Sequence, residues 1–397
     1  MIEQLSIASI WLASLLCVGW ARVVLRSFRT LGAIPRLPNS IPLDDNDPHP
    51  SVSAIVPLCG RIRDVERAVH SLLAQEAVQM QVILVEDGAP DAEHKKAEVL
   101  AKQDPRVLLL KTKKRPVGWV ERNYALELGQ GRAEGDFLLF TDGDVIHTRR
   151  SVRRAIWVMQ ENKLDHLALK PRLELSGLWQ RMLKPMYFLL CELRLLDARA
   201  VDPTSEVGAG VGAFNLVNAE SYRLRGTHAA LRGSLVEERA LGRMMRTDDG
   251  RGMLMRAVTQ VRWRPFEHEL GPLFATARTG MLGALSNSPL AAVVSGMLLM
   301  AGVVLPAFFL LLGLPLFLAG HPPWMVAPAI IALLLPVFGI LRVREMVRLS
   351  LFTLLASPLA VLFVGAAALQ AGLLLGLLGK IEWRGRAYSR RDLNELA

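Results

Sequence analysis

Apolar residues are concentrated in four stretches of the chain, and this distribution limits what the chain can fold into. One stretch lies near the start, at residues 5–24, and has Arg22 as its single charge. The other three lie near the end, at residues 289–320, 322–341 and 349–379. About 20 apolar residues in a helix are enough to cross the hydrocarbon core of a bilayer. The sequence therefore predicts membrane spans on both sides of a water-soluble block.

The basic residues beside these stretches predict the topology. Arg22, Arg26 and Arg29 follow the first apolar stretch, and no small-residue cleavage site stands out, which favours a retained anchor over a signal peptide. The positive-inside rule places these arginines and the soluble block in the cytoplasm of a multi-pass inner-membrane protein. Simple alternation would put the basic tail at 380–391 outside. One long segment would then be re-entrant or a helical hairpin, and the number of spans stays open.

Charge and cysteine content exclude two classes of protein. The net charge is +10, but the basic residues are scattered around the soluble block and accompany no nucleic-acid motif, so we expect no nucleic-acid partner. Attraction to anionic lipid headgroups explains them better. Cys17, Cys59 and Cys191 are too few and too dispersed for a disulfide framework or a thiolate metal site.

The soluble block alternates between strand and helix signals. After a proline-rich linker at 31–50, strands are expected at 51–57, 81–85, 106–110 and 137–140, and helices at 64–74, 92–103, 119–128 and 151–160. Short apolar strands separated by helices predict a mostly parallel α/β sheet. The predicted organisation is an anchor at 1–30, the linker at 31–50, a catalytic domain at 51–280, membrane helices at 281–380 and a basic tail at 381–397.

Carboxylates follow two of these strands. Asp87 follows the second strand, and Asp142 and Asp144 follow the fourth, so all three are expected at the ligand-binding edge of the sheet. Two close carboxylates can hold Mg2+ or Mn2+ against a diphosphate. The alternative for Asp142 and Asp144 is a solvated turn around Gly143. Glu86 and Asp87 are candidates for a nucleobase or ribose contact, or for a turn or helix cap before Pro90.

Three further segments have a functional and a structural interpretation each. Glu237 and Glu238 can supply a general base, or simply two favourable acids in a first helical turn. Arg122 follows a basic run and can reach a diphosphate, or lie on the surface. The helix expected at 178–196 is an interfacial or a core helix. A glycine-rich strand is expected at 208–217.

The acidic motifs resemble those of the family 2 glycosyltransferases, which have the GT-A fold. The resemblance covers about residues 50–390 and includes the segments 52–57, 85–88, 141–144 and 237–241. The segments 116–119, 277–280, 288–289 and 383–388 are similar to the membrane-bound glycosyltransferases associated with hopanoid biosynthesis and to their carotenoid-glycosylating relatives.

This resemblance implies an inverting, metal-dependent hexosyltransferase with a nucleotide-sugar donor, a UDP-sugar in particular, and a membrane lipid acceptor. By position, the donor would contact Pro57, Glu86, Asp87, Arg122 and Asp142, and the metal would bind Asp142 and Asp144. Glu238 would be the base. Leu241 lies three positions after Glu238, so we expect both to face the fold and Glu237 to be more exposed.

The chain departs from the family pattern at several of these positions. Glu86 replaces the usual Asp, Glu238 stands where Asp is typical, and Arg122 is the nearest candidate for an absent Lys. Gln260 lies one position too close to Arg262 and Trp263 to complete the motif of processive polymerases. A processive polysaccharide synthase and a non-catalytic membrane scaffold are therefore the alternatives. The sugar, the lipid and the oligomeric state are not specified by the sequence.

Overall fold

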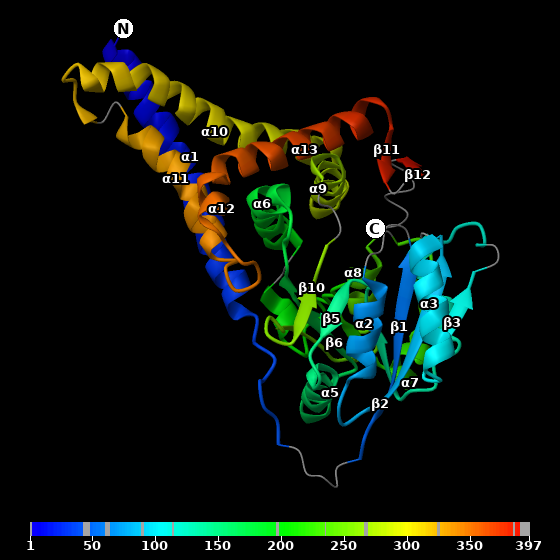
Figure 1. Ribbon diagram of the computed structural model, residues 1–397. Helices are drawn as coiled ribbons and strands as arrows, with labels where there is room; N and C mark the ends of the chain where they lie inside the picture. Colours follow the sequence, from blue (N-terminus) through cyan, green and yellow to red (C-terminus); the bar gives the residue numbers. More distant parts are fainter. Residues whose placement is uncertain are drawn as a thin grey trace. The chain divides into compact units, whose positions relative to one another are not determined.

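The chain forms two compact units. The computed structural model describes residues 2–42, 48–59, 64–88, 91–112, 115–195, 198–234, 236–265, 269–323, 326–383 and 386–389 (Figure 1). We call Ala33–Glu174 with Asp197–Phe266 the α/β unit, and Met1–Gly32 with Leu175–Leu196 and Glu267–Asn394 the helical unit.

A seven-stranded sheet forms the centre of the α/β unit. Its order is β3-β2-β1-β4-β8-β6-β9. The strands are β1 (Ser51–Cys59), β2 (Gln79–Asp87), β3 (Val107–Lys111), β4 (Phe137–Phe140), β6 (His166–Lys170), β8 (Asn215–Asn218) and β9 (Gly252–Arg256). Only β8 runs antiparallel to its neighbours. The predicted mostly parallel sheet and the positions of its first four strands are confirmed.

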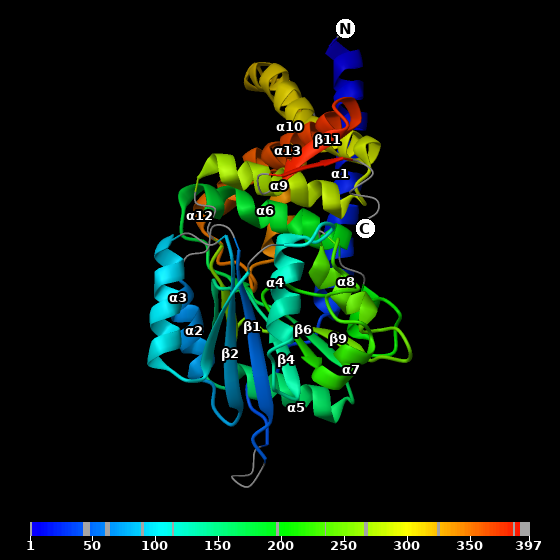
Figure 2. The same cartoon turned by 90° about the vertical axis from the view of Figure 1, so that its right-hand side faces the viewer.

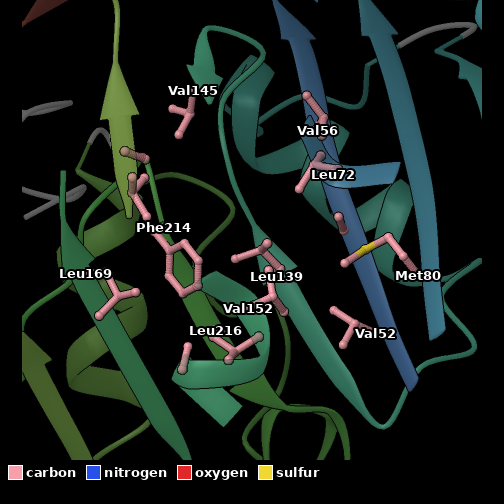
Figure 3. Close-up of a cluster of buried hydrophobic side chains, with 14 of the residues drawn as sticks. Val52, Val56, Leu72, Met80, Leu139, Val145, Val152, Leu169, Phe214 and Leu216 are labelled. Carbon is pink, nitrogen blue, oxygen red and sulfur yellow. The ribbon is translucent and has the colours of Figure 1, made fainter. Parts of the chain in front are cut away.

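Helices cover both faces of this sheet because its central strands are apolar on both sides. On one face, Val52, Val56 and Leu58 of β1 pack with helices α2 (Val65–Leu73), α3 (Asp91–Gln103) and α5 (Ser151–Glu161). Figure 3 shows Leu72 of α2 against this cluster. On the other face, Ile55 packs with α4 (Glu121–Gln130), α7 (Ala219–Leu224) and α8 (Glu237–Met244). Figure 2 shows α4 on the side of the sheet opposite α2 and α3.

Helix α4 approaches the sheet closely at Gly129. A Cβ atom built there would lie 2.4 Å from the side-chain Cγ2 of Ile55, so a larger residue would require the Ile55 side chain to move. This contact fixes the helix whose first turn carries Arg122.

A small second sheet lies beside the end of β4. It consists of β5 (Val145–His147), β10 (Val261–Trp263) and β7 (Arg172–Leu173), in the order β5-β10-β7. Strand β10 pairs antiparallel with β5, which places Trp263 in register with Val145. The short 3-10 helix η1 (Ala198–Val201) also belongs to the α/β unit.

The glycine-rich segment differs from its prediction. Only Asn215–Asn218, and not the whole of 208–217, is a strand. The preceding glycines form a loop against α8, where a Cβ at Gly210 would lie 1.5 Å from the carbonyl oxygen of Glu238. One at Gly208 would lie 2.1 Å from that of Gly242. These glycines therefore serve backbone-to-backbone packing, and the sequence pattern of a strand was misleading.

The predicted linker also differs from the expectation of a segment without a core. Ile34 and Leu37 are buried, and the backbone N–H of Leu37 donates to Arg256 of β9 at 2.8 Å. The prolines prevent a regular strand but leave this amide able to pair with the edge of the sheet. Residues 43–47 of the linker lie outside the described residues.

The helical unit gathers helices from three parts of the chain. They are α1 (Ile2–Ala33), α6 (Leu178–Leu195), α9 (Leu270–Ala284), α10 (Pro289–Leu318), α11 (Ala327–Leu341), α12 (Leu351–Leu355) and α13 (Ser357–Leu377), followed by the hairpin β11 (Lys380–Trp383) and β12 (Arg386–Ser389). Helix α6 packs against α9 and α13 and buries Leu183, Met186 and Leu189, as in the core-helix interpretation. Contacts thus group α6 and α9 with the C-terminal helices, whereas the predicted boundary at 280 placed them with the catalytic domain.

Two helices are long and apolar enough to cross a membrane, within the part of the chain that the structure describes. They are α10 and α13, and both are C-terminal. The predicted N-terminal span lies in helix α1, where several side chains of the first half lie outside the described residues. The stretch predicted at 349–379 divides into α12 and α13. Ser350 caps the first of these helices, and a proline in the first turn opens the second.

Candidate functional site

The turn between β4 and β5 carries the Asp-Gly-Asp motif at the carboxyl end of the parallel strands. Strand β4 pairs with β1 up to Ile55, whose carbonyl accepts from the backbone N–H of Thr141 at 3.2 Å. The buried Thr141 hydroxyl donates to Ala213 at 2.7 Å. Asp142 and Asp144 follow, so their predicted delivery by a buried strand is confirmed.

Arg122 joins Asp142 to the acidic pair on α8. Its Nη1 is ion-paired with Oδ1 of Asp142, and its Nε is ion-paired with Oε1 of Glu237. Its Nη2 donates to the carbonyl of Gly212 at 3.4 Å. The side chains of Arg122, Asp142 and Glu237 are 13%, 22% and 7% exposed, respectively. Residues 115 positions apart in sequence therefore share one partly buried cluster.

Electrostatics keep this arginine charged. Burial alone lowers the pKa of Arg122, but the negative charges of Asp142 and Glu237 outweigh burial and raise the pKa above its ordinary value. The surface-arginine interpretation of Arg122 is therefore wrong.

The two acids of α8 are arranged in the opposite way to the expectation. Glu237 is buried, whereas Glu238 is only half-buried. On a helix, positions four apart share a face, and so do positions three apart. Leu241 lies four positions after Glu237 and three after Glu238, so it is compatible with either acid facing inward. Arg122 decides between them by pairing with Glu237. The exposure predicted for Glu237 was wrong.

Glu238 has a different electrostatic environment from its neighbour. Burial, and then the negative charge of Glu237, raises the pKa of the Glu238 carboxyl to about 8. The guanidinium of Arg122 opposes this shift but does not cancel it. A carboxyl with such a pKa can gain or lose a proton near neutral pH.

Asp144 is held by a residue from the second sheet. The indole Nε1 of Trp263 donates to Oδ2 of Asp144 at 3.0 Å. Trp263 is a site residue that the sequence interpretation did not name for this role, although its Arg-Trp pair was noted. Gln260 is buried elsewhere and donates to the carbonyl of Leu37 at 3.2 Å and to Asn39 at 2.9 Å. Its role is therefore in attaching the linker.

Glu86 and Asp87 point to different neighbours because successive strand residues alternate between faces. Asp87 accepts from the Thr112 hydroxyl at 2.9 Å and pairs with Nη1 of Arg115 at 3.3 Å. Glu86 pairs with His94 of α3 at 3.3 Å and with Lys111 of β3 at 3.4 Å. Glu86 therefore braces a strand against a helix, and Asp87 is the better candidate for a nucleotide contact.

Pro57 is buried in β1, where it is in register with Val85. It lies near the same carboxyl end of the sheet as Asp87. Of the basic run before Arg122, Lys113 and Lys114 lie outside the described residues, as does Pro90 of the proposed turn.

The donor set at the Asp-Gly-Asp turn fits a hard divalent cation. Among the described residues, no group of three or more His, Cys, Asp or Glu is placed to hold a metal. Two carboxylates are nevertheless a sufficient protein contribution for Mg2+ bound to a phosphate substrate, because the phosphates and water supply the other ligands. Asp142 and Asp144 provide that pair.

Comparisons with known proteins find similarity in the α/β part of the chain. Residues 53–212, less than half of the chain, match the family model described as Glycosyl transferase family 2. The matched segment includes Asp87, Arg122, Asp142 and Asp144 and ends before Glu237. This match supports the family-level resemblance; the likeness to the hopanoid-associated and carotenoid-glycosylating enzymes stays a prediction.

Individual relatives match over different extents. An uncharacterized glycosyltransferase, EpsJ of Bacillus subtilis (strain 168), is 31% identical over 116 residues, which are 29% of this chain and 32% of EpsJ. The chain thus matches about a third of the length of this curated relative. The fold is similar to that of the mannosyltransferase PcManGT from Pyrobaculum calidifontis, solved with GDP-Man and Mn2+, with a TM-score of 0.51 and 15% identity over 93% of this chain and 99% of that one. S. aureus TarS matches 58% of this chain and 40% of its own, with a TM-score of 0.38 and 16% identity.

Proposed function

We propose that the chain is a glycosyltransferase that moves a sugar from a nucleotide-sugar donor to a membrane lipid. The observation that carries the proposal is the Arg122 bridge, which brings the Asp-Gly-Asp turn and the acidic pair of α8 into one site. The family 2 domain at 53–212 supports the reaction class.

The nucleoside would bind beside Asp87. Its carboxylate, already oriented by Thr112 and Arg115, can accept from a nucleobase imide or a ribose hydroxyl. The resemblance of the motifs favours a UDP-sugar. PcManGT was solved with GDP-Man, so binding assays with UDP and GDP are the test of which nucleobase the donor carries.

The diphosphate would bind beside Asp142 and Asp144. A divalent cation, Mg2+ or Mn2+, would offset the charge that grows on the departing nucleotide. Trp263 orients Asp144, and Arg122 adds a positive charge beside Asp142. Charges that are in place once the donor has bound need no rearrangement during the reaction.

Glu238 would be the general base. Its raised pKa, about 8, suits a group that accepts a proton from an acceptor hydroxyl near neutral pH. Glu237 is ion-paired with the guanidinium of Arg122, so its carboxylate is less available to an acceptor hydroxyl. A base that activates the acceptor for direct displacement leads to inversion at the anomeric carbon.

A lipid acceptor is supported by the apolar surface of the helical unit. Leu290, Leu298, Leu311 and Leu318 of α10 are 66–76% exposed. An apolar surface of this kind is unfavourable in water and favourable in a bilayer. We therefore propose a multi-pass inner-membrane protein with its α/β unit in the cytoplasm. Within the described part of the chain, no observation favours a processive synthase or a scaffold. Gln260, the residue that comes nearest to completing the motif of processive polymerases, is used in attaching the linker.

Substitution of the two aspartates tests the reaction. Asp142→Asn and Asp144→Asn keep the size of each side chain but remove its charge, so transfer of labelled sugar to lipid should be abolished in both. Asp104→Asn, at an exposed turn of the same unit, is the matched control and should leave transfer unchanged. Full turnover in both site variants would contradict the proposed function.

Cysteine labelling tests the topology. Ser40 is exposed in the linker, so a Ser40→Cys variant offers a thiol to reagents on its own side of the membrane. A membrane-impermeant maleimide should label it in inverted membrane vesicles and not in intact cells. The unmodified chain, which carries Cys17, Cys59 and Cys191, gives the background in each preparation. Labelling in intact cells above that background would contradict a cytoplasmic α/β unit.

A further inference from the structure

Arg122 occupies an unusual place for a positive charge in the site. It lies between Asp142, a proposed cation ligand, and Glu237, the neighbour of the proposed base. One guanidinium faces two carboxylates and one backbone carbonyl, that of Gly212. The charge that Asp142 would offer to a divalent cation is therefore already partly balanced by the protein itself.

We propose that Arg122 is a resident counter-ion that opposes binding of a divalent cation alone and turns to the diphosphate when cation and donor bind together. This inference rests on the proposed function and concerns the order in which the ligands of that site can bind. It assigns Arg122 a positioning role that depends on whether donor is present.

The energetic reason is the cost of removing one partner from a partly buried charge. A cation bound to Asp142 in the absence of donor would displace the guanidinium from one of its two carboxylate partners, and the loss of a charged partner in a partly buried place is unfavourable. A diphosphate brings negative charge of its own to the same place. The guanidinium then exchanges one anionic partner for another, and this cost disappears.

The chemistry of arginine suits this exchange. Its Nε contacts Glu237, whereas its Nη1 contacts Asp142, so the two acids use different nitrogens of one planar group. Nη1 can therefore change partner while Nε keeps Glu237. A lysine has a single ammonium and lacks two separate donors in a fixed fork.

Binding of Mn2+ to the full-length protein without nucleotide tests the proposal directly. Free Mn2+ is counted by its electron paramagnetic resonance signal during a titration of the wild type and of Arg122→Gln. In Arg122→Gln, Asp142 has lost its charged partner, so Mn2+ should bind about tenfold more tightly or better. This change in affinity corresponds to the free energy of one hydrogen bond to a charged group. The same variant should bind UDP, at saturating Mn2+, about tenfold more weakly.

These opposite directions separate the proposal from a general loss of structure, which would weaken both ligands. Arg106→Gln is the control, because it also removes an arginine paired with an aspartate, at 2.8 Å from Asp104, but on the surface. It should change neither affinity. Arg122→Lys keeps the charge and should bind Mn2+ no tighter than the wild type, while its UDP affinity falls.

The outcomes also separate this proposal from the proposed function. Equal Mn2+ affinities for the wild type and Arg122→Gln, with UDP binding by the wild type intact, would overturn the counter-ion role and leave the glycosyltransferase proposal standing. Tighter Mn2+ binding by Arg122→Gln, in a protein that binds no UDP or GDP, would support the counter-ion role and count against the nucleotide-sugar donor.

Discussion

The two units of the chain use the same apolar residue types in opposite ways. In the α/β unit, helix α2 buries Val65, Val69 and Leu72 against the sheet and presents its polar residues outward. In the helical unit, helix α10 has no polar face, and Leu298 and Leu311 on its outside are 66% and 73% exposed. An amphipathic helix is suited to water on one side, whereas a helix apolar all round is suited to a protein interior or to lipid.

Charged side chains follow the same division. The carboxylates of Asp87, Asp142 and Glu237 lie near the carboxyl ends of strands or at a helix start in the α/β unit, and each is paired with an arginine. Helices α10 and α13 carry no Asp, Glu, Lys or Arg. This division agrees with the proposal that the α/β unit carries out the chemistry and the helical unit attaches the protein to the membrane.

The largest effect is expected for the proposed base. Glu238→Gln keeps the size of the side chain but removes the proton acceptor, so the transfer rate should fall by about 10²–10⁴. Donor binding should survive because the Arg122 bridge to Asp142 does not involve Glu238. Kinetics with saturating donor and a separate UDP-binding measurement check both parts.

Glu237→Gln is the matched control for that experiment. It removes a partner of Arg122, so we expect a weaker donor affinity with a much smaller loss in kcat. A dead Glu237 variant beside an active Glu238 variant would reverse the assignment of the base.

The pH profile provides a second test of Glu238. Its pKa is raised to about 8, and a base must be ionised, so kcat/KM should rise with pH and level off above about 8. The pKa of Arg122, which faces Glu238, is raised above its ordinary value, so Arg122 stays charged over this range and should not mask the step. A profile that is flat from pH 6 to pH 9 would contradict this assignment.

The sequence was sufficient for the sheet but not for the arrangement of the site. The apolar run Phe137–Phe140 between polar neighbours is a local signal, and it predicted β4 with its bounds. The Arg122 bridge depends on how close α4 and α8 lie across a fold, which no local pattern specifies. For the same reason, Leu241 could not tell which of two adjacent acids faces inward.

Misleading signals have similar physical causes. Prolines in the linker suggested a segment without a core, yet Leu37 is buried in the apolar core of the α/β unit and its backbone N–H pairs with Arg256. Glycines at 208–212 suggested a strand, yet they allow a loop to touch the backbone of α8. In both cases a tertiary contact outweighed the local preference of the residues.

A pair of leucine truncations compares the two units directly. Leu72 is 1% exposed in the core of the α/β unit, so Leu72→Ala should destabilise the fold by about 2–5 kcal/mol. Leu298 of α10 is 66% exposed, so Leu298→Ala leaves almost no cavity and should cost less than about 0.5 kcal/mol. Thermal unfolding of both variants in the same detergent checks this. Equal losses of stability in the two variants would show that α10 is packed as a core helix, and the contrast between the two units would then be wrong.

The smallest effect is expected at Trp263, where a single hydrogen bond crosses from the second sheet to the Asp-Gly-Asp turn. Trp263→Phe keeps an aromatic ring in β10 but removes the N–H that donates to Asp144 at 3.0 Å. A hydrogen bond to a charged acceptor contributes about 1.5–3 kcal/mol, and part of this loss is recovered when water reaches the carboxylate. We therefore expect the KM for donor to rise by about five- to tenfold, with kcat little changed, because Asp144 keeps its charge and loses only its orientation. Trp157 packs against the apolar core of the same unit, so Trp157→Phe controls for the loss of an indole and should leave the KM for donor unchanged. A Trp263→Phe enzyme with an unaltered donor KM would show that the turn orients Asp144 without the second sheet.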